Sequence, residues 1–96
     1  MYALCGEDIV RFESAGSYTT VYLRDGNKIM VSRLIKDFDE LLSGTGFFRL
    51  HQSHLINMEH LFCFEKHEGH VIMKDQSVVP VSSRKKDQLL TLLQGI

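Results

Sequence analysis

The stretch Phe47-Phe-Arg-Leu-His-Gln-Ser-His-Leu-Ile-Asn57 joins a strand pattern to an unusually mixed set of polar groups. It opens with alternating apolar and polar residues, passes through His51-Gln-Ser53 and becomes apolar again before Asn57. A strand that only fills a core has no use for a guanidinium, an imidazole, amides and a hydroxyl within nine residues. We therefore expect the polar centre to face a partner while the apolar residues anchor it to the core. These anchors are Phe47, Phe48, Leu50, Leu55 and Ile56.

The chain before this stretch predicts antiparallel hairpins. Asp8–Glu13 has strand character, and Ser14–Ser17 is a cluster of turn residues. The β-branched and aromatic residues of Tyr18–Leu23 predict a second strand, and Asp25-Gly26 is a hairpin signal. Lys28–Ser32 then returns as the partner strand.

One helix is predicted between these strands and the opening stretch. Its apolar residues recur at i, i+1, i+4, i+7 and i+8, with charged residues opposite, which is one helical face. Ser32 is suited to the N-cap and Gly44 to the stop. We expect this helix only to pack against a sheet. Its apolar residues are Leu34, Ile35, Phe38, Leu41 and Leu42.

The chain after Gln52 predicts further strands and one last helix. We expect Ser53–His60 to form a turn or a single helical turn. Pro80 lacks an N–H, which favours an edge strand or a strand end. The fold class is therefore mainly β with two short helices. The remaining predicted elements are strands at Leu61–Lys66, His70–Asp75 and Val78–Val81, then a helix capped by Ser82-Ser83 with the stripe Leu89, Leu90 and Leu93.

Length and charge limit the possible classes of protein. The chain has 96 residues, enough for one small domain, and 44% of them are hydrophobic, which suffices for a core. The net charge of −1 means that the overall charge does not indicate nucleic-acid binding. A local basic patch can still bind phosphate on a nearly neutral protein. The densest basic point is Arg84-Lys-Lys86.

The sequence predicts a cytoplasmic location. Cys5 and Cys63 form no CxxC motif and read as small apolar residues in a reducing compartment. No apolar run approaches the roughly 18 residues of a membrane span, and the N-terminus lacks the pattern of a signal peptide. We expect residues 1–96 to be a single domain, and a fragment of a longer regulator.

Neither catalysis nor a metal or cofactor site is expected. His51/His54 and His67/His70 form HxxH pairs, but positions i and i+3 of a strand point to opposite faces, and the second pair flanks a turn. No HExxH, GxSxG or glycine-rich phosphate loop supports a metal site, a hydrolase or a phosphate-binding enzyme.

Nucleic-acid binding accounts for the polar groups best. Gln52 can bond adenine through N6 and N7, while His51, Ser53 and Asn57 can donate to phosphate. Arg84-Lys-Lys86 would stand at a helix start, where backbone N–H groups favour an anion. Three cations there are unfavourable unless an anion offsets them.

These residues also carry a family resemblance. Phe47–Asn57 closely resembles the F-x-R-x-H-R-S-x-x-V-N signature of the LytTR family, the DNA-binding output domains of many bacterial response regulators. The resemblance covers about residues 7 to 94. Its other parts are Ile9–Ser14 with Tyr18, Asp25-Gly26, the Leu34–Leu42 helix and Val79–Arg84.

The resemblance implies an elongated stack of short antiparallel sheets whose loops, rather than a recognition helix, meet DNA. The loop after the first strand and the His51–Ser53 segment would enter successive major grooves. Carried over, Tyr18, Gln52 and Arg84 are the principal readers, and His51, Ser53 and Lys85 are phosphate contacts. Gln52 stands where the family commonly has Arg or Asn, which favours adenine at the matching base. The resemblance also implies that Asn57 forms a turn rather than contacting a base.

The implied function is sequence-specific DNA binding as the output domain of a two-component transcriptional regulator. The implied partners are double-stranded DNA with promoter repeats and a receiver domain in the full-length protein. We expect a dimer on DNA and a monomer for the isolated domain. Two other classes stay open: a protein-interaction β-module using an exposed strand edge, and a small-molecule or metal sensor.

Overall fold

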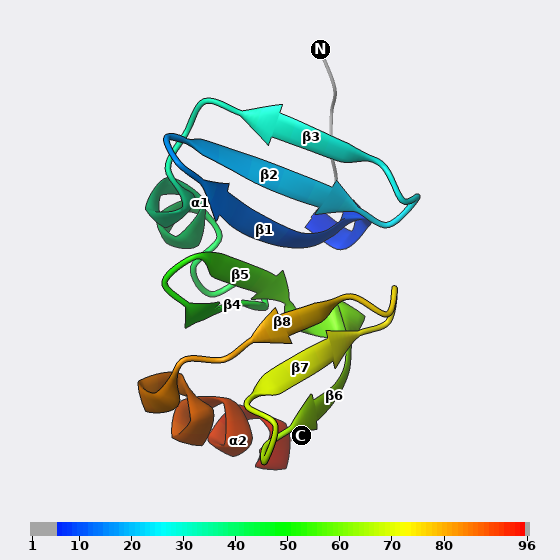
Figure 1. Ribbon diagram of the computed structural model, residues 1–96, viewed down its shortest axis with the longest axis vertical. Coiled ribbons are helices and arrows are strands. Elements are labelled where there is room, and N and C mark those ends of the chain that lie inside the picture. The colour runs from blue at the N-terminus through cyan, green and yellow to red at the C-terminus, as the bar shows by residue number, and fades with distance from the viewer. Residues whose placement is uncertain (1–5, 96) are drawn as a thin grey trace.

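The computed structural model describes residues 6–95, which form an elongated molecule of 39 × 24 × 23 Å (Figure 1). The strands are β1 Ile9–Ala15, β2 Tyr18–Leu23, β3 Lys28–Val31, β4 Phe47–His51, β5 His54–Asn57, β6 Leu61–Glu65, β7 His70–Met73 and β8 Val78–Pro80. The helices are α1 Ile35–Leu41 and α2 Lys86–Gln94, with short 3-10 turns η1 Gly6–Asp8, η2 Met58–His60 and η3 Ser83–Lys85.

Two antiparallel sheets are stacked along the long axis. The larger has five strands in the order β3-β2-β1-β5-β4, and the smaller has three in the order β6-β7-β8. In Figure 1 the larger sheet, with α1, lies above the smaller sheet and α2. This architecture confirms the predicted fold class, and Pro80 ends an edge strand as expected.

Strand β5 connects the two hydrophobic cores. Successive side chains of a strand point to opposite faces. Leu55 accordingly joins Phe12, Val21 and Ile35 in the core beneath α1, while its neighbour Ile56 joins the core against the smaller sheet. Both are fully buried, and so is Leu50 of β4. The predicted anchors therefore do hold this hairpin to the molecule, with Phe47 half-buried at the margin.

The prediction for Ser53–His60 is wrong in its first half. His54–Asn57 is a full strand, paired with β1 on one side and β4 on the other. The helical turn is confined to η2, whose N-cap is Asn57. Two consecutive apolar residues can both be buried when a strand has a core on each face, and this fact about tertiary structure is hidden from the local pattern.

Asn57 has the turn-forming role. Its Oδ1 accepts from the Glu59 N–H at 3.0 Å, and its Nδ2 donates to the carbonyls of Gly6 and Ile9 at 3.2 and 3.0 Å. The side chain is buried. It ties η2 to the beginning of the described chain.

Helix α1 begins later than predicted. Its N-cap is Leu34, an apolar residue, rather than Ser32. Leu34 and Leu41 are 48% and 74% exposed, so only part of the predicted face is buried. A helix of seven residues offers a narrow stripe, which Ile35 and Phe38 fill.

The basic trio straddles two elements instead of opening a helix. Arg84 and Lys85 lie in η3, and α2 begins at Lys86. Among the described residues the Ser82 side chain makes no capping bond, but the Ser82 carbonyl accepts from the Lys85 N–H at 2.9 Å. That backbone N–H is therefore unavailable to an anion. Leu89 is buried as predicted.

Candidate nucleic-acid interface

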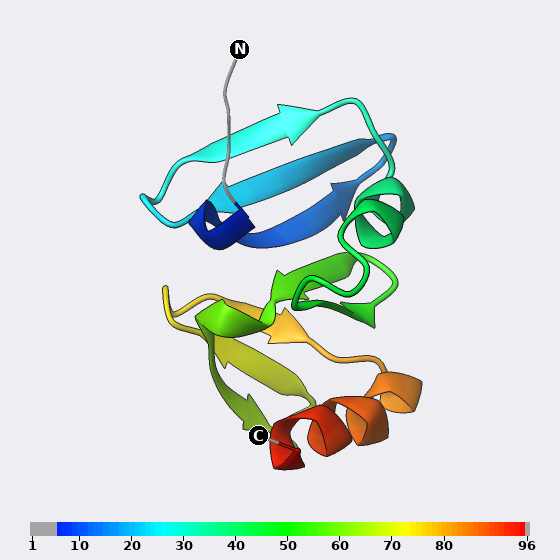
Figure 2. The ribbon, with the colours of Figure 1, turned by 180° about the vertical axis from the view of Figure 1, so that it is seen from behind.

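Three turns lie along one side of the long axis, as the two opposite views agree (Figures 1 and 2). They are the β1–β2 turn, the β4–β5 turn and η3, and we call this side the loop edge. Backbone hydrogen bonds tie the turns together. The Ser14 N–H donates to the Ser53 carbonyl at 2.9 Å, and the Ser82 N–H donates to the Leu50 carbonyl at 2.9 Å.

The β4–β5 turn presents Gln52 to solvent. His51 pairs with His54 across a two-residue turn, so Gln52 and Ser53 form its tip. Gln52 is exposed, and within residues 6–95 its side-chain amide makes no hydrogen bond, whereas the backbone around it is tethered. A fixed backbone carrying a free amide is suited to recognising an external donor and acceptor pair.

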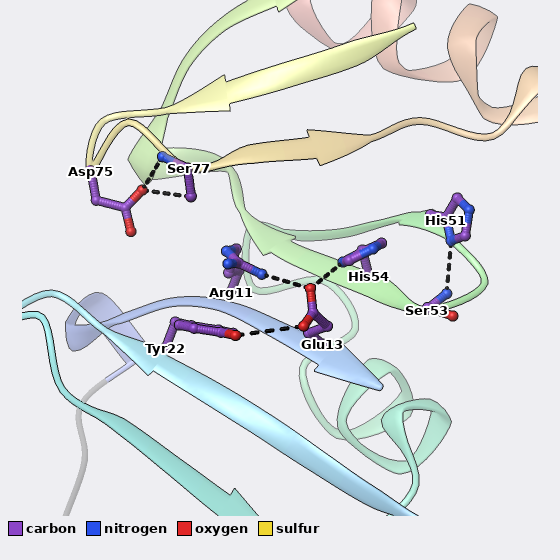
Figure 3. A network of polar contacts seen from close by, with 8 residues as sticks. All are labelled: Arg11, Glu13, Tyr22, His51, Ser53, His54, Asp75 and Ser77. Atoms are coloured by element: carbon purple, nitrogen blue, oxygen red, sulfur yellow. Dashed lines mark hydrogen bonds and ion pairs between the residues drawn. The ribbon is translucent and has the colours of Figure 1, made fainter. Parts of the chain in front are cut away.

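The imidazole of His51 has a defined tautomer. Its Nδ1 lies 3.0 Å from the Ser53 backbone nitrogen (Figure 3). Because a backbone N–H can only donate, Nδ1 must be the acceptor, and the ring proton of the neutral form is on Nε2. Nε2–H remains a donor for a group outside the turn.

A hollow beside this turn collects most of the predicted site. Its cations outnumber its carboxylates, since Asp39 is the single acidic residue among those that line it. Arg84 is exposed, and Lys85 is half-buried with Nζ 5.7 Å from the centroid of the Phe48 ring. The lining residues are Asp39, Arg49, His51, Gln52, Ser82, Arg84 and Lys85.

Two predicted residues lie outside that hollow. Tyr18 is 47% exposed and opens β2 opposite Ala15, so it is on the loop edge but in a different turn. Ser53 is half-buried, with its N–H bound to the His51 ring and its carbonyl bound to Ser14. Four of the six predicted residues are thus brought together, with these two beside them.

A polar network behind the turn was not predicted. The Glu13 carboxylate lies 3.4 Å from Arg11 Nη1, 3.5 Å from the Tyr22 hydroxyl and 3.6 Å from His54 Nδ1 (Figure 3). The Arg11 guanidinium also lies over the Tyr22 ring, 3.8 Å from its centroid. Arg11 and Glu13 stand two apart on one strand, which indicates a shared face, but the sequence does not reveal their partners on β2 and β5.

The prediction that the side chains of His51 and His54 point to opposite faces of a strand is wrong. Their ring centroids are 5.2 Å apart, because the turn makes them cross-strand neighbours rather than positions i and i+3 of one strand. Burial lowers the pKa of His54, Glu13 opposes this, and His51 and Arg11 lower the pKa further. Within the described residues no group of three or more potential metal ligands is found.

The side opposite the loop edge carries a hollow of mixed charge. It contains more carboxylates than Lys and Arg residues, so it does not favour an anion. Asp75 there accepts from the N–H and the hydroxyl of Ser77 at 2.9 and 2.6 Å. The lining residues are Glu7, Val10, Arg24, Glu59, His60, Lys74 and Asp75.

Comparison with known proteins gives a consistent family. The family model described as the LytTr DNA-binding domain matches residues 1–94. A solved LytTr DNA-binding domain from Bacillus cereus, from a protein described as a methyl-accepting/DNA response regulator, has the same fold. Its TM-score is 0.78 at 21% identity, over 91% of this chain and 82% of that one.

Two curated relatives come from Paraburkholderia xenovorans (strain LB400). They are described as the heme-containing CO-sensing transcriptional regulators RcoM 1 and RcoM 2. They are 33% and 32% identical to this chain over 91 residues. The match covers 91% of the chain but 34% of each relative, so the chain spans about a third of their length. No helix of the described residues is long and apolar enough to cross a membrane.

Proposed function

The chain belongs to the LytTr DNA-binding domain family, and from this premise we propose that it binds double-stranded DNA sequence-specifically through the loop edge. The observation that carries the proposal is the placement of Gln52. Its side-chain amide, which makes no hydrogen bond within residues 6–95, stands at the tip of a tethered turn, beside a hollow lined by Arg84 and Lys85. Cations supply sequence-independent attraction to phosphate, while an amide supplies base discrimination.

The residues divide into two roles. We assign base contacts to Gln52, Arg84 and Tyr18, with Gln52 bonded to adenine N6 and N7. We assign phosphate contacts to His51, Ser53 and Lys85, where His51 donates through Nε2–H.

We further propose that the domain is the output half of a longer cytoplasmic regulator. A receiver domain is the input that the family resemblance implies, in a two-component system. Pairing of two such chains on promoter repeats would raise affinity through effective concentration, so the isolated domain should bind weakly and as a monomer. The two relatives from Paraburkholderia are described as CO-sensing transcriptional regulators, which supports a role in transcription with inputs that differ between proteins.

Oligonucleotide selection followed by a salt titration tests the proposal. Duplexes recovered from a random pool give a preferred site, and its affinity is measured between about 50 and 200 mM salt. Affinity should fall steeply, with a slope of about −0.9 for each phosphate neutralised. A flat salt response with no enriched sequence would contradict the proposal and favour a protein-interaction or sensor module.

A further inference from the structure

Arg49 holds the two carbonyl groups that shape the β4–β5 turn. Its Nε donates to the His51 carbonyl at 3.1 Å, and its Nη2 donates to the Gln52 carbonyl at 2.6 Å. The side chain is 20% exposed. One guanidinium therefore fixes the peptide groups on both sides of the Gln52 Cα, the atom from which the amide projects.

We call the two hydrogen bonds from Arg49 to the His51 and Gln52 carbonyls the brace. The β4–β5 turn needs it because the turn does not have the backbone conformation that two-residue hairpins favour. Two-residue hairpin turns prefer types I′ and II′, which require positive φ. Within residues 6–95 the one non-glycine residue with positive φ is Gln76, so neither Gln52 nor Ser53 supplies it. The register also shifts between Arg49 and His51, which marks a local irregularity. A turn of this kind depends on side-chain hydrogen bonds for a single conformation.

Asp39 connects this brace to helix α1. Its Oδ2 lies 3.4 Å from Arg49 Nη1. The preceding residue, Phe38, stacks on Phe12 with ring centroids 4.7 Å apart, which fixes α1 against the sheet. Helix α1 is therefore connected to the backbone of the β4–β5 turn through the ion pair between Asp39 and Arg49.

We propose that Arg49 and Asp39 are positioning residues that set the direction of the Gln52 amide and contact no DNA themselves. This inference rests on the DNA-binding function proposed above. Its rival is that Arg49 is a phosphate contact like Lys85. The two roles differ in what they require of the side chain: a phosphate contact needs a cation, whereas the brace needs the planar fork of a guanidinium, which lysine lacks.

Arg49→Lys separates these roles, because it keeps the charge and loses the fork. We expect affinity for the selected site to fall about tenfold, the scale of one hydrogen-bonded contact, while affinity for random DNA and the salt slope stay unchanged. Retained affinity for the selected site would overturn the positioning role. So would an equal loss on both DNAs.

Asp39→Asn is expected to change the affinities for random DNA and for the selected site in opposite directions. Removing a carboxylate near DNA should by itself tighten binding to every duplex. We expect tighter binding to random DNA but weaker binding to the selected site, since the amide no longer holds Arg49 by charge. The matched control is Glu40→Gln on the exposed side of α1, which should strengthen or leave unchanged the binding to both. Tighter binding of Asp39→Asn to both duplexes would contradict the inference.

A measurement without DNA keeps this inference separate from the proposed function. The Ser53 N–H is held by the His51 ring, so its hydrogen exchange reports the closed turn. We expect exchange at Ser53 to accelerate about tenfold in Arg49→Lys while amides of the smaller sheet keep their protection. Unchanged exchange at Ser53 would overturn the brace, whereas accelerated exchange in a protein that binds no DNA would overturn only the proposed function.

Discussion

The ring of His51 accepts a hydrogen bond from the N–H of Ser53, with 3.0 Å between Nδ1 and the backbone nitrogen. The bond closes over Gln52, and the Ser53 carbonyl is in turn bound by the Ser14 N–H of β1. The turn is therefore fixed by the His51 side chain and by strand β1 in the absence of a bound partner. Such preorganisation lowers the entropic cost of recognition.

Gln52→Ala should remove base reading with little other effect. We expect a loss of about 1–3 kcal/mol on the selected site and almost none on random DNA, since one bidentate contact to adenine is lost. Competition binding with both duplexes measures this difference. Gln88→Ala, at an exposed position of α2, is the matched control and should change neither affinity. A folded Gln52→Ala domain with unchanged affinity for its site would remove the assignment.

Lys85→Ala should weaken binding to all sequences about equally. We expect the salt slope to become shallower by about 0.9, since one phosphate contact disappears. Lys28→Ala removes the same charge from the exposed start of β3 and should leave the slope unchanged. Equal slopes for the two variants would show that Lys85 contributes only to the overall charge.

The anchors and the basic trio illustrate what the sequence could predict. Apolar spacing correctly identified Leu50, Leu55 and Ile56 as buried, because burial follows side-chain chemistry. The pattern could not identify β5 as a strand, since its burial on two faces depends on β1 and the smaller sheet. The bond from the Lys85 N–H to the Ser82 carbonyl was equally hidden, because it depends on where the turn ends and α2 begins.

The brace at the turn shows a second limit. The family signature draws attention to the residues around Gln52, but Asp39 lies on a helix that we expected only to pack. Its contact with Arg49 joins positions ten residues apart through tertiary structure. Charged residues on an amphipathic helix are usually solvated, so the local pattern gave no reason to select this one.

Asn57→Ala should destabilise the fold without touching the loop edge. The substitution leaves the Glu59 N–H and the carbonyls of Gly6 and Ile9 without the buried Asn57 side chain as their partner, and we expect unfolding to become easier by about 1–3 kcal/mol. Urea denaturation measures the change. Asn27→Ala, which removes a side-chain bond to Asp25 within an exposed turn, should cost less. An Asn57→Ala domain as stable as the natural chain would contradict the structural role.

His54 should make stability depend on pH in a defined direction. Burial lowers its pKa below the ordinary value of 6.5, with Glu13 opposing and His51 and Arg11 adding to the shift. Below pH 6.5 the unfolded chain therefore binds more protons at this position than the folded one. Stability should fall as the pH drops below that value and be constant, as far as His54 is concerned, above it.

Comparing the natural chain with His54→Asn separates the contribution of His54 to the pH dependence of stability from those of the other four histidines. We expect the unfolding free energy of His54→Asn to decline less than that of the natural chain when the pH is lowered from 7.5 to about 5.5, because the residue whose pKa is lowered on folding is gone. Urea denaturation at each pH gives both curves. His67→Asn, at an exposed turn, should keep the natural pH dependence. Parallel curves for His54→Asn and the natural chain would mean that Glu13 stabilises the imidazolium at 3.6 Å as much as burial destabilises it.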